Sequence, residues 1–440
     1  MKQENAEKII LPDAFAARMR EQLGGEYDAF AASFDKPLAG ALRISRRYSE
    51  EKLAARTGWA LSKVPWSLDG YYYDEADHPG RHPLHEAGAY YIQEPSAMSV
   101  AAAADVRPGM RVLDLCAAPG GKSCALADAL AGSGLLVANE IIPKRAAILS
   151  QNVERMGLAN TVVTNETPER IAGRFPEFFN RVVVDAPCSG EGMFKKEPDA
   201  LSMWSPETVA MCAARQKEIL EQAAACVAPG GKLIYSTCTF AREEDEDNIK
   251  WFLANHGDYS LISEEKLLPH KIEGGGHYVA VLQKAGEAAQ APANGKLKSN
   301  RTQTEEWKRF AAAYMPEYIY DKNLLLSFGD HLYLMPEAVN LDGLKVTRPG
   351  LELGAMDHGR FMPAYALAHA LLPGEFSQVE ELSDEQAAAY IRGEVLPCSA
   401  GFSGYTLLRI DGVGLAFGKT SGGQIKNHYP KGLRRGIIIS

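Results

Sequence analysis

Hydrophobic and polar positions alternate in two different ways between Arg107 and about Leu282. Short apolar runs are followed by longer stretches that have the spacing of amphipathic helices. The runs are RVLDL, GLLVANE, TVVTN, RVVVDA and KLIYST, and the helical stretches are KSCALADALAG, PKRAAILSQNVERMG and residues 208–227. Strands that alternate with helices predict an α/β fold with a mostly parallel sheet and helices on both faces. We expect the last segment, GGGHYVAVLQK, to form a hairpin.

The segments on either side of this core mix helices and strands. Before it we expect a helix from Pro12 to Gly24, a strand at ALRIS, and helices at KLAARTG and at residues 96–105. After it come a helix at EEWKRFAAAYM, a helix with Ser383 as N-cap and Gly393 at its end, and a hairpin that turns at Asp411-Gly412. Residues 285–303 have few large apolar side chains and favour a linker. The predicted domains are an N-terminal α+β extension (1–105), the core (106–284), a linker (285–304) and a C-terminal α+β region (305–440).

Composition argues against several classes of protein. Of the 440 residues, 46% are hydrophobic and 23% are charged, as in ordinary globular proteins. No uncharged apolar run reaches the length of about 18 residues that a membrane span needs. The start, MKQENAEKIILPDAF, lacks the apolar core of a secretory signal, so we expect a cytoplasmic protein. The seven cysteines form no CxxC pair and show no zinc-finger spacing with histidine, so no metal is expected.

Charge is distributed unevenly along the chain. The formal net charge of −9 argues weakly against a nucleic-acid partner. From Gly401 onwards, however, six cations face one acid, Asp411. A basic patch on an acidic protein can contact phosphate, and a solvated basic terminus is the alternative. The cations that we expect to contact phosphate are Lys419, Lys426, Lys431 and Arg434.

The segment DLCAAPGGKS, residues 114–123, follows an apolar run and precedes a helical stretch. Its small residues and glycines let the turn approach a ligand, and the helix N-terminus beyond offers free N–H groups. Glu140 ends the next apolar run, where a carboxylate can accept both ribose hydroxyls of an adenosine cofactor. Asp185 ends a later run, at the same edge of the sheet. GxGxxG and GxxxxGK[ST] are absent from this turn, which argues against a dinucleotide cofactor and a P-loop.

Two cysteines follow apolar runs at this edge. Cys188 comes three residues after Asp185, and Cys238 follows KLIYST. We interpret the segment between them as a single helical stretch, so the two runs would be neighbouring parallel strands and both thiols would lie beside the cofactor turn. A thiolate can add to C6 of a cytosine and activate C5 for methylation, after which a base removes the C5 proton and the thiol is expelled. Buried structural thiols are the alternative.

Other candidates have simpler interpretations. The acidic run from Glu243 to Asp247 is interpreted as the N-terminus of a helix, where carboxylates are favourable. Cys116 lies within the cofactor turn, and Cys124, Cys212 and Cys226 are expected in the core.

The motifs DLCAAPGGKS, DAPCSGEGMF and YSTCTF, in this order, resemble the Sun/Fmu (NSUN-type) family of RNA cytosine-5 methyltransferases. YYIQEPSAM and AFGKTSGGQIKNHYPKGLRR are similar to the bacterial RsmF-like subgroup, so the resemblance covers nearly the whole chain. It implies a Rossmann-like methyltransferase core, an N-terminal RNA-contacting extension and a C-terminal PUA-like RNA-binding region. It also implies S-adenosylmethionine as cofactor and RNA as partner; we expect a monomer.

The resemblance implies a role for each motif residue. Cys238 would be the nucleophile, Cys188 would assist product release, and Asp185 would lie where cofactor and base meet. The implied cofactor-binding residues are Cys116, Ala117, Ala118, Pro119, Gly120, Gly121, Lys122, Glu140, Arg145 and Asp185. Where many members carry an aspartate near the adenine, this chain has Asn165 and Glu166, which leaves the adenine contact unassigned.

The expected activity is methylation of C5 of a cytosine in RNA, and the subgroup points to small-subunit ribosomal RNA. A tRNA methylated by the same chemistry is the first alternative. A non-catalytic RNA-binding protein is disfavoured because both thiols and Asp185 are present. A nicotinamide oxidoreductase is disfavoured because GxGxxG is missing.

Overall fold

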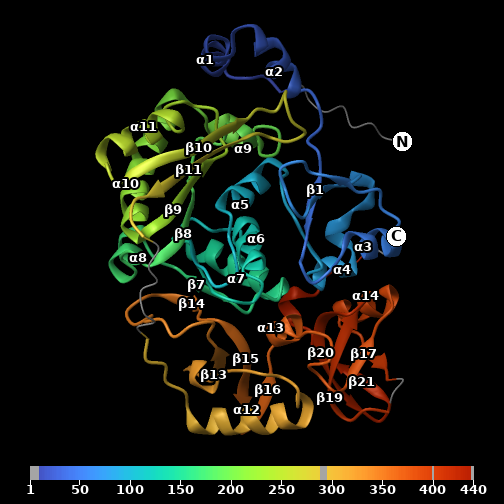
Figure 1. The fold of residues 1–440 in the computed structure, drawn as a ribbon. Helices are drawn as coiled ribbons and strands as arrows, with labels where there is room; N and C mark the ends of the chain where they lie inside the picture. The colour runs from blue at the N-terminus through green and yellow to red at the C-terminus, as the bar shows by residue number, and fades with distance from the viewer. Residues whose placement is uncertain (1–8, 288–294, 399–400, 438–440) are drawn as a thin grey trace.

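The computed structural model describes residues 9–287, 295–398 and 401–437 (Figure 1). Part of the predicted linker, residues 288–294, lies outside the described residues. The described chain forms four sheets, of which the largest is the sheet of the core. No helix in the described ranges is long and apolar enough to cross a membrane.

The N-terminal segment forms a small four-stranded sheet in the order β2-β3-β1-β4, with short helices around it. Its elements are α1 (Asp13–Leu23), α2 (Tyr27–Ser33), β1 (Ala41–Ile44), α3 (Glu50–Thr57), β2 (Ser62–Lys63), β3 (Gly70–Tyr72), α4 (Pro83–Glu86), β4 (Tyr90–Ile92) and α5 (Ser99–Ala104). Helices α1 and α2 lie apart from this sheet, at one end of the molecule (Figure 1).

The core sheet has eight strands in the order β10-β11-β9-β8-β5-β6-β7-β14. Strands β5 to β9 run parallel to one another. On one side β11 pairs antiparallel with β9, and β10 pairs antiparallel with β11. On the other side β14 pairs antiparallel with β7. The elements of the core are β5 (Arg111–Asp114), α6 (Gly121–Ala129), β6 (Leu135–Asn139), α7 (Pro143–Arg155), β7 (Thr161–Thr164), α8 (Pro168–Arg174), β8 (Phe179–Asp185), α9 (Pro198–Met203), α10 (Pro206–Cys226), β9 (Val227–Thr237), α11 (Glu246–Asn255), β10 (Tyr259–Leu267) and β11 (His277–Lys284).

Successive side chains of the parallel strands enter two separate hydrophobic clusters, one on each face of the sheet. Leu113 and Val137 belong to the cluster with α8, α10 and α11, whereas Val112 and Leu136 pack with α5, α6 and α7. Burial on both faces explains why these strands are almost continuously apolar in sequence. The predicted α/β core with helices on both faces is confirmed.

The C-terminal region contains two further sheets, in the orders β12-β13-β15-β16 and β17-β19-β20-β21-β18. Its elements are α12 (Arg301–Tyr314), β12 (Leu325–Phe328), β13 (His331–Leu334), β14 (Val346–Arg348), β15 (Leu351–Asp357), β16 (Arg360–Pro363), α13 (Tyr365–Ala370), β17 (Val379–Glu381), α14 (Asp384–Arg392), β18 (Leu396–Pro397), β19 (Gly404–Ile410), β20 (Val413–Ser421) and β21 (Gln424–Asn427). Ser383 is the N-cap of α14, as predicted, and it forms a capping box with Gln386. The predicted hairpin β19–β20 turns at Asp411 and Gly412, which both have positive φ.

Four details differ from the sequence-based expectations. The segment between Cys188 and Cys238 contains two helices, α9 and α10, instead of one. GGGHYVAVLQK supplies only β11, and its hairpin partner is β10, an edge strand too exposed to show an apolar pattern. Helix α12 begins at Arg301, inside the predicted linker. Strand β14 joins the core sheet by pairing with β7, although it lies in the C-terminal region.

Candidate active site

Hydrogen bonds from neighbouring segments fix the turn between β5 and α6 at the carboxyl edge of the core sheet. The Ala117 N–H donates to the Asn139 carbonyl, and the Asn152 side chain donates to the Pro119 carbonyl at 2.9 Å. Gly120 has φ +115°, and a Cβ at this position would lie 3.0 Å from Leu149 Cδ1. A side chain here would strain the backbone and would require Leu149 to move by a few tenths of an ångström.

Asp114, at the end of β5, lies beneath this turn and is completely buried. Ser123 Oγ donates to its Oδ2 at 2.6 Å, while Oδ1 has no hydrogen-bond partner in the described structure. Burial raises the pKa of Asp114 to about 7, although the Ser123 hydrogen bond opposes the shift. This carboxyl group was not singled out as a site residue from the sequence.

Glu140 follows β6 directly and is 4% exposed. Its Oε1 accepts the Ile142 N–H at 2.9 Å, and its Oε2 lies 3.5 Å from Arg145 Nη1. Arg145 also donates to the Ala118 carbonyl at 2.9 Å, so one guanidinium connects Glu140 to the turn. The predicted cofactor residues from Cys116 to Lys122, with Glu140 and Arg145, therefore lie together at one edge of the sheet.

Asp185, the last residue of β8, is the polar centre of the site. Its Oδ2 accepts from Lys122 Nζ at 2.8 Å, and its Oδ1 accepts from Ser236 Oγ at 2.9 Å and lies 3.5 Å from His277 Nε2. Burial acts to raise the pKa of Asp185, but Lys122 and His277 outweigh it and hold the pKa below its usual range. Asp185 is thus a carboxylate, able to accept hydrogen bonds.

Cys188 and Cys238 meet beside this centre. Strands β8 and β9 are parallel neighbours, with Asp185 opposite Ser236, so the thiols that follow them converge. The two Sγ atoms are 3.1 Å apart, within hydrogen-bonding distance for sulfur. The hydrogen bond to Cys238, together with burial, raises the pKa of the Cys188 thiol well above its ordinary value. Cys188 is therefore held in its protonated form.

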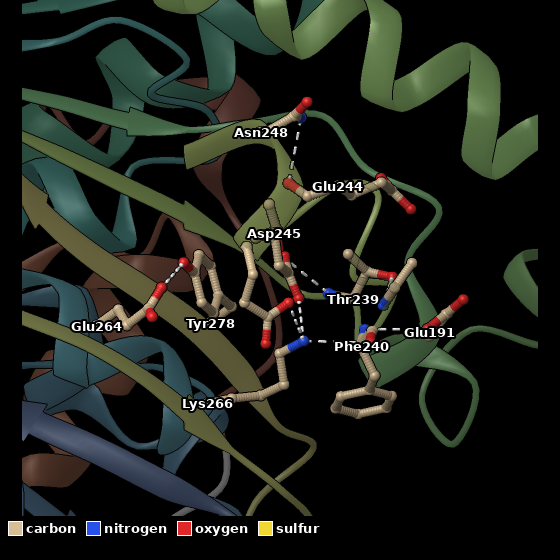
Figure 2. Close-up of polar contacts among 12 residues, drawn as sticks. Glu191, Thr239, Phe240, Glu244, Asp245, Asn248, Glu264, Lys266 and Tyr278 are labelled. Atoms are coloured by element: carbon tan, nitrogen blue, oxygen red, sulfur yellow. Dashed lines mark hydrogen bonds and ion pairs between the residues drawn. The ribbon is translucent and has the colours of Figure 1, made fainter. Parts of the chain in front are cut away.

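A buried polar network, part of which is drawn in Figure 2, contacts the segments that follow Cys188 and Cys238. Ser189 Oγ and Thr239 Oγ1, each one residue past a cysteine, are hydrogen-bonded at 2.8 Å. Glu244 accepts the Ser189 N–H at 3.0 Å. Asp245 accepts from Thr237 Oγ1 at 2.6 Å and pairs with Lys266 at 2.8 Å.

The acidic run 243–247 lies at the N-terminus of helix α11, as interpreted from the sequence, with Asp245 as the N-cap residue, but the sequence did not indicate that Glu244 and Asp245 are buried. Helix α11 begins only at Glu246, and both carboxylates are completely buried behind the cysteines. Burial raises the pKa of Glu244, although Ser189 and Gln216 donate to it. The only sequence signal was that these acids follow Cys238 within seven residues.

Asn165 and Glu166 lie after β7, at the edge beside Glu140. The Asn165 side chain donates to the Glu140 carbonyl at 2.7 Å. Glu166 is 3% exposed, and its carboxylate accepts from Arg170 and from the Lys345 N–H of the C-terminal region. Neither residue was assigned a contact from the sequence.

The four C-terminal cations lie in the five-stranded sheet and just beyond it. Lys419 and Lys426 face each other across β20 and β21, and Lys419 Nζ lies 5.7 Å from the centroid of the Tyr405 ring. Lys431 begins a short 3₁₀ turn, and Arg434 donates to Asn427 Oδ1 at 3.2 Å. The side chains of all four cations are exposed to solvent.

Comparison with known families divides the chain as follows. Residues 101–287 match the family described as 16S rRNA methyltransferase RsmB/F, and residues 11–95 match the N-terminal domain of 16S rRNA methyltransferase RsmF. Residues 309–371 match the RsmF rRNA methyltransferase first C-terminal domain, and residues 377–435 match the methyltransferase RsmF PUA domain.

Relatives match nearly the whole chain, and solved structures match part of it. The chain is 31% identical to the ribosomal RNA small subunit methyltransferase F of Cronobacter sakazakii, with 98% of each chain covered, and to that of Salmonella paratyphi A, with 97% of each covered. Among solved structures, a methyltransferase homolog protein from Pyrococcus horikoshii is similar with a TM-score of 0.55 and 27% identity, covering 62% of this chain and 94% of that one. NSun6 from Pyrococcus horikoshii with SFG has a TM-score of 0.56 at 17% identity over 63% and 99% of the chains, which shows a shared fold.

Proposed function

Because the chain belongs to the family of ribosomal RNA small subunit methyltransferases F, we propose that it transfers a methyl group from S-adenosylmethionine to C5 of a cytosine in small-subunit ribosomal RNA. The observation that carries this proposal is the pair of thiols, Cys188 and Cys238, 3.1 Å apart beside the ionised Asp185. Methyl transfer that does not need covalent activation of the base has no use for two thiols at this place.

The residues at the edge fit S-adenosylmethionine. Glu140 presents a nearly buried carboxylate after β6, where it can accept the two ribose hydroxyls. The turn from Cys116 to Lys122 has alanine, proline and glycine at its centre, so its backbone can approach the cofactor closely. When bound, this cofactor supplies a methyl group on a sulfonium.

The proposed chemistry at the base begins with Cys238. Its thiolate forms a bond to C6, and the electron pair of the C5–C6 double bond moves to C5, which then takes the methyl group. Loss of the C5 proton to a base returns that pair to the ring and breaks the bond from Cys238 to C6. Asp185, as a carboxylate, accepts a hydrogen bond from the exocyclic amine of the cytosine.

The raised pKa of Cys188 supports this division of roles. It keeps Cys188 as a thiol, which can donate a hydrogen bond to the sulfur of Cys238. Cys188 is then suited to act after the attack, during release of the product. Cys238 and not Cys188 is the nucleophile in this assignment.

RNA contacts are proposed at both ends of the chain. The C-terminal cations Lys419, Lys426, Lys431 and Arg434 face solvent in the PUA region. At the other end, a cavity of about 670 Å³ between α2 and the β10–β11 loop is lined by three lysines, Lys36, Lys195 and Lys271, and by three acids, Asp74, Glu75 and Glu273. Its lysines can hold phosphates of the RNA that flank the target base.

The test is methyl transfer by the purified protein with radiolabelled S-adenosylmethionine. Isolated small ribosomal subunits, naked small-subunit RNA and bulk tRNA are offered in parallel, and the product is mapped by bisulfite sequencing. Label in small-subunit RNA at a cytosine supports the proposal. Label only in tRNA would make this a tRNA methyltransferase with the same chemistry, and no transfer to any RNA would contradict the proposal.

A further inference from the structure

Glu191 is a completely buried carboxylate three residues past Cys188, at the start of a 3₁₀ turn (Glu191–Met193). Its Oε1 accepts from Arg18 Nη2 at 2.6 Å and from the Trp204 indole N–H at 2.8 Å. Its Oε2 accepts the backbone N–H of Phe240 at 2.9 Å, a bond drawn in Figure 2. One side chain therefore connects α1, the segment after Cys188 and the segment after Cys238.

The backbone around Cys238 depends on these contacts. Next to Glu191, the Gly192 N–H donates to the Cys238 carbonyl at 2.8 Å. On the far side of Thr239, Phe240 gives its N–H to Glu191, and its carbonyl accepts from Lys266 Nζ at 3.2 Å. The position of the Cys238 thiol is thus determined mainly by groups outside its own strand.

The N-terminal helices reach the same segment in two ways. The Arg18 guanidinium of α1 lies 5.4 Å from the centroid of the Phe15 ring and 5.6 Å from that of the Trp204 ring. These two rings help to fix the position of the guanidinium, in addition to its ion pair with Glu191. The Phe30 ring of α2 packs edge-on against the Phe240 ring at 5.4 Å. Helices α1 and α2, far from the N-terminal sheet in Figure 1, therefore pack on the segment that follows Cys238.

We propose that the Arg18–Glu191 ion pair positions Cys238, so that helices α1 and α2 determine how fast this thiol reacts. The proposal rests on the proposed function, in which Cys238 attacks the base. Arg18 and Glu191 are positioning residues, since Glu191 binds the Phe240 N–H, Arg18 acts through Glu191, and neither touches the reacting atoms. A buried carboxylate that loses its cation is costly, so removal of Arg18 should displace Glu191 and, with it, Phe240 and Cys238.

Two substitutions isolate the ion pair. Arg18→Met keeps an unbranched side chain between the aromatic rings but removes the charge. Glu191→Gln keeps an oxygen that can accept the Phe240 N–H but removes the negative partner. Arg20→Met is the matched control, because Arg20 is exposed on the same helix and its guanidinium lies over the Tyr27 ring at 4.5 Å.

Three quantities are measured for each variant. These are kcat and KM for RNA methylation, the rates at which iodoacetamide alkylates Cys238 and Cys188 without RNA or cofactor, and the midpoint of thermal unfolding. For both variants we expect kcat to fall about tenfold with KM within about twofold of wild type, because a displaced reacting group lowers the rate of the bound complex. The alkylation rate of Cys238 should change by more than about threefold, and the double variant should be no worse than the more affected single variant.

Several outcomes overturn the proposal. One is that both variants are folded, as their thermal unfolding shows, and that kcat and the Cys238 alkylation rate stay within about twofold of wild type in both. Another is that the Arg20→Met control shows the same losses, or that the two single effects add fully in the double variant. If wild-type protein methylates no RNA, the proposed function fails, but the alkylation rates of Cys238 still decide whether the ion pair positions the thiol.

Discussion

The Sγ atoms of Cys188 and Cys238 lie 3.1 Å apart, although 50 residues separate them in the chain. This is longer than the S–S bond of about 2.05 Å in a disulfide, so the two are free thiols in contact. Because one thiol is the hydrogen-bond partner of the other, a change at either residue alters the chemistry of both.

The two cysteines should fail at different steps when replaced. Cys238→Ala should form no covalent protein–RNA adduct and no product, because the attacking thiolate is gone. Cys188→Ala should still attack and methylate but release slowly, and should accumulate an adduct that survives denaturing electrophoresis. A persistent adduct in Cys238→Ala with none in Cys188→Ala would reverse the two roles, and full activity in both variants would exclude the covalent mechanism.

Hydrogen peroxide should inactivate the enzyme reversibly. One molecule of peroxide oxidises the two thiols to a disulfide and is itself reduced to two waters. The disulfide can form because the sulfur atoms need to move only about 1 Å to reach bonding distance. Mass spectrometry of unreduced peptides should find a Cys188–Cys238 link, and dithiothreitol should restore activity. Loss of activity with no such link would mean that oxidation acts elsewhere.

Glu140→Ala should weaken binding of S-adenosylmethionine more than tenfold. Hydrogen bonds to a charged acceptor contribute about 1.5–3 kcal/mol each, and two ribose hydroxyls are expected to lose theirs. Calorimetric titration measures the affinity, and Glu169→Ala, an exposed acid on α8, is the control. Unchanged affinity in a folded Glu140→Ala protein would remove Glu140 from the cofactor site.

Replacing Lys426, Lys431 and Arg434 with alanine should weaken RNA binding and flatten its salt dependence. Each lost phosphate contact should lower the slope of log affinity against log salt by about one unit. Filter binding at several salt concentrations gives this slope, with the exposed Lys322→Ala variant as control. If both affinity and slope stay at the wild-type value, these cations are only solvated.

Stability should depend on pH through Asp114. Burial raises its pKa from an ordinary 3.8 to about 7, so the folded state favours the protonated form. The stability that this group contributes is complete below pH 3.8 and is lost as pH rises through 7. The unfolding midpoint of wild type should therefore fall more between pH 5 and pH 8 than that of Asp114→Asn, which cannot ionise. Parallel curves for the two proteins would show that Asp114 is ionised in the fold throughout.

The parts of the fold that could be predicted are those that depend on the residue pattern within a short stretch of sequence. Continuous apolar runs and the turn residues after them placed β5 to β9 in sequence, and their parallel order brought Cys188 and Cys238 to one edge. Glu140 and Asp185 could be placed by the same argument, because Glu140 directly follows β6 and Asp185 ends β8.

What could not be predicted depends on pairings between distant segments. Arg18 and Glu191 are 173 residues apart, and nothing in the pattern around Arg18 distinguishes it from Arg20, the other cation of α1. His277 begins an antiparallel strand whose place beside β9 is a matter of topology, so its approach to Asp185 was missed. Glu244 and Asp245 have the composition of an exposed helix start, and only the tertiary structure buries them.

Strand β14 makes the core sheet dependent on a segment translated long after the rest of it. Val346 pairs with Thr164 of β7, and Arg348, 2% exposed, pairs with Glu154 of α7 at 2.9 Å. Chains emerge from the ribosome N-terminus first, so β7 keeps an unpaired edge until Arg348 has been synthesised. A nascent chain that stalls, or a recombinant core cut at residue 284, presents that edge to other chains and is prone to aggregate through it.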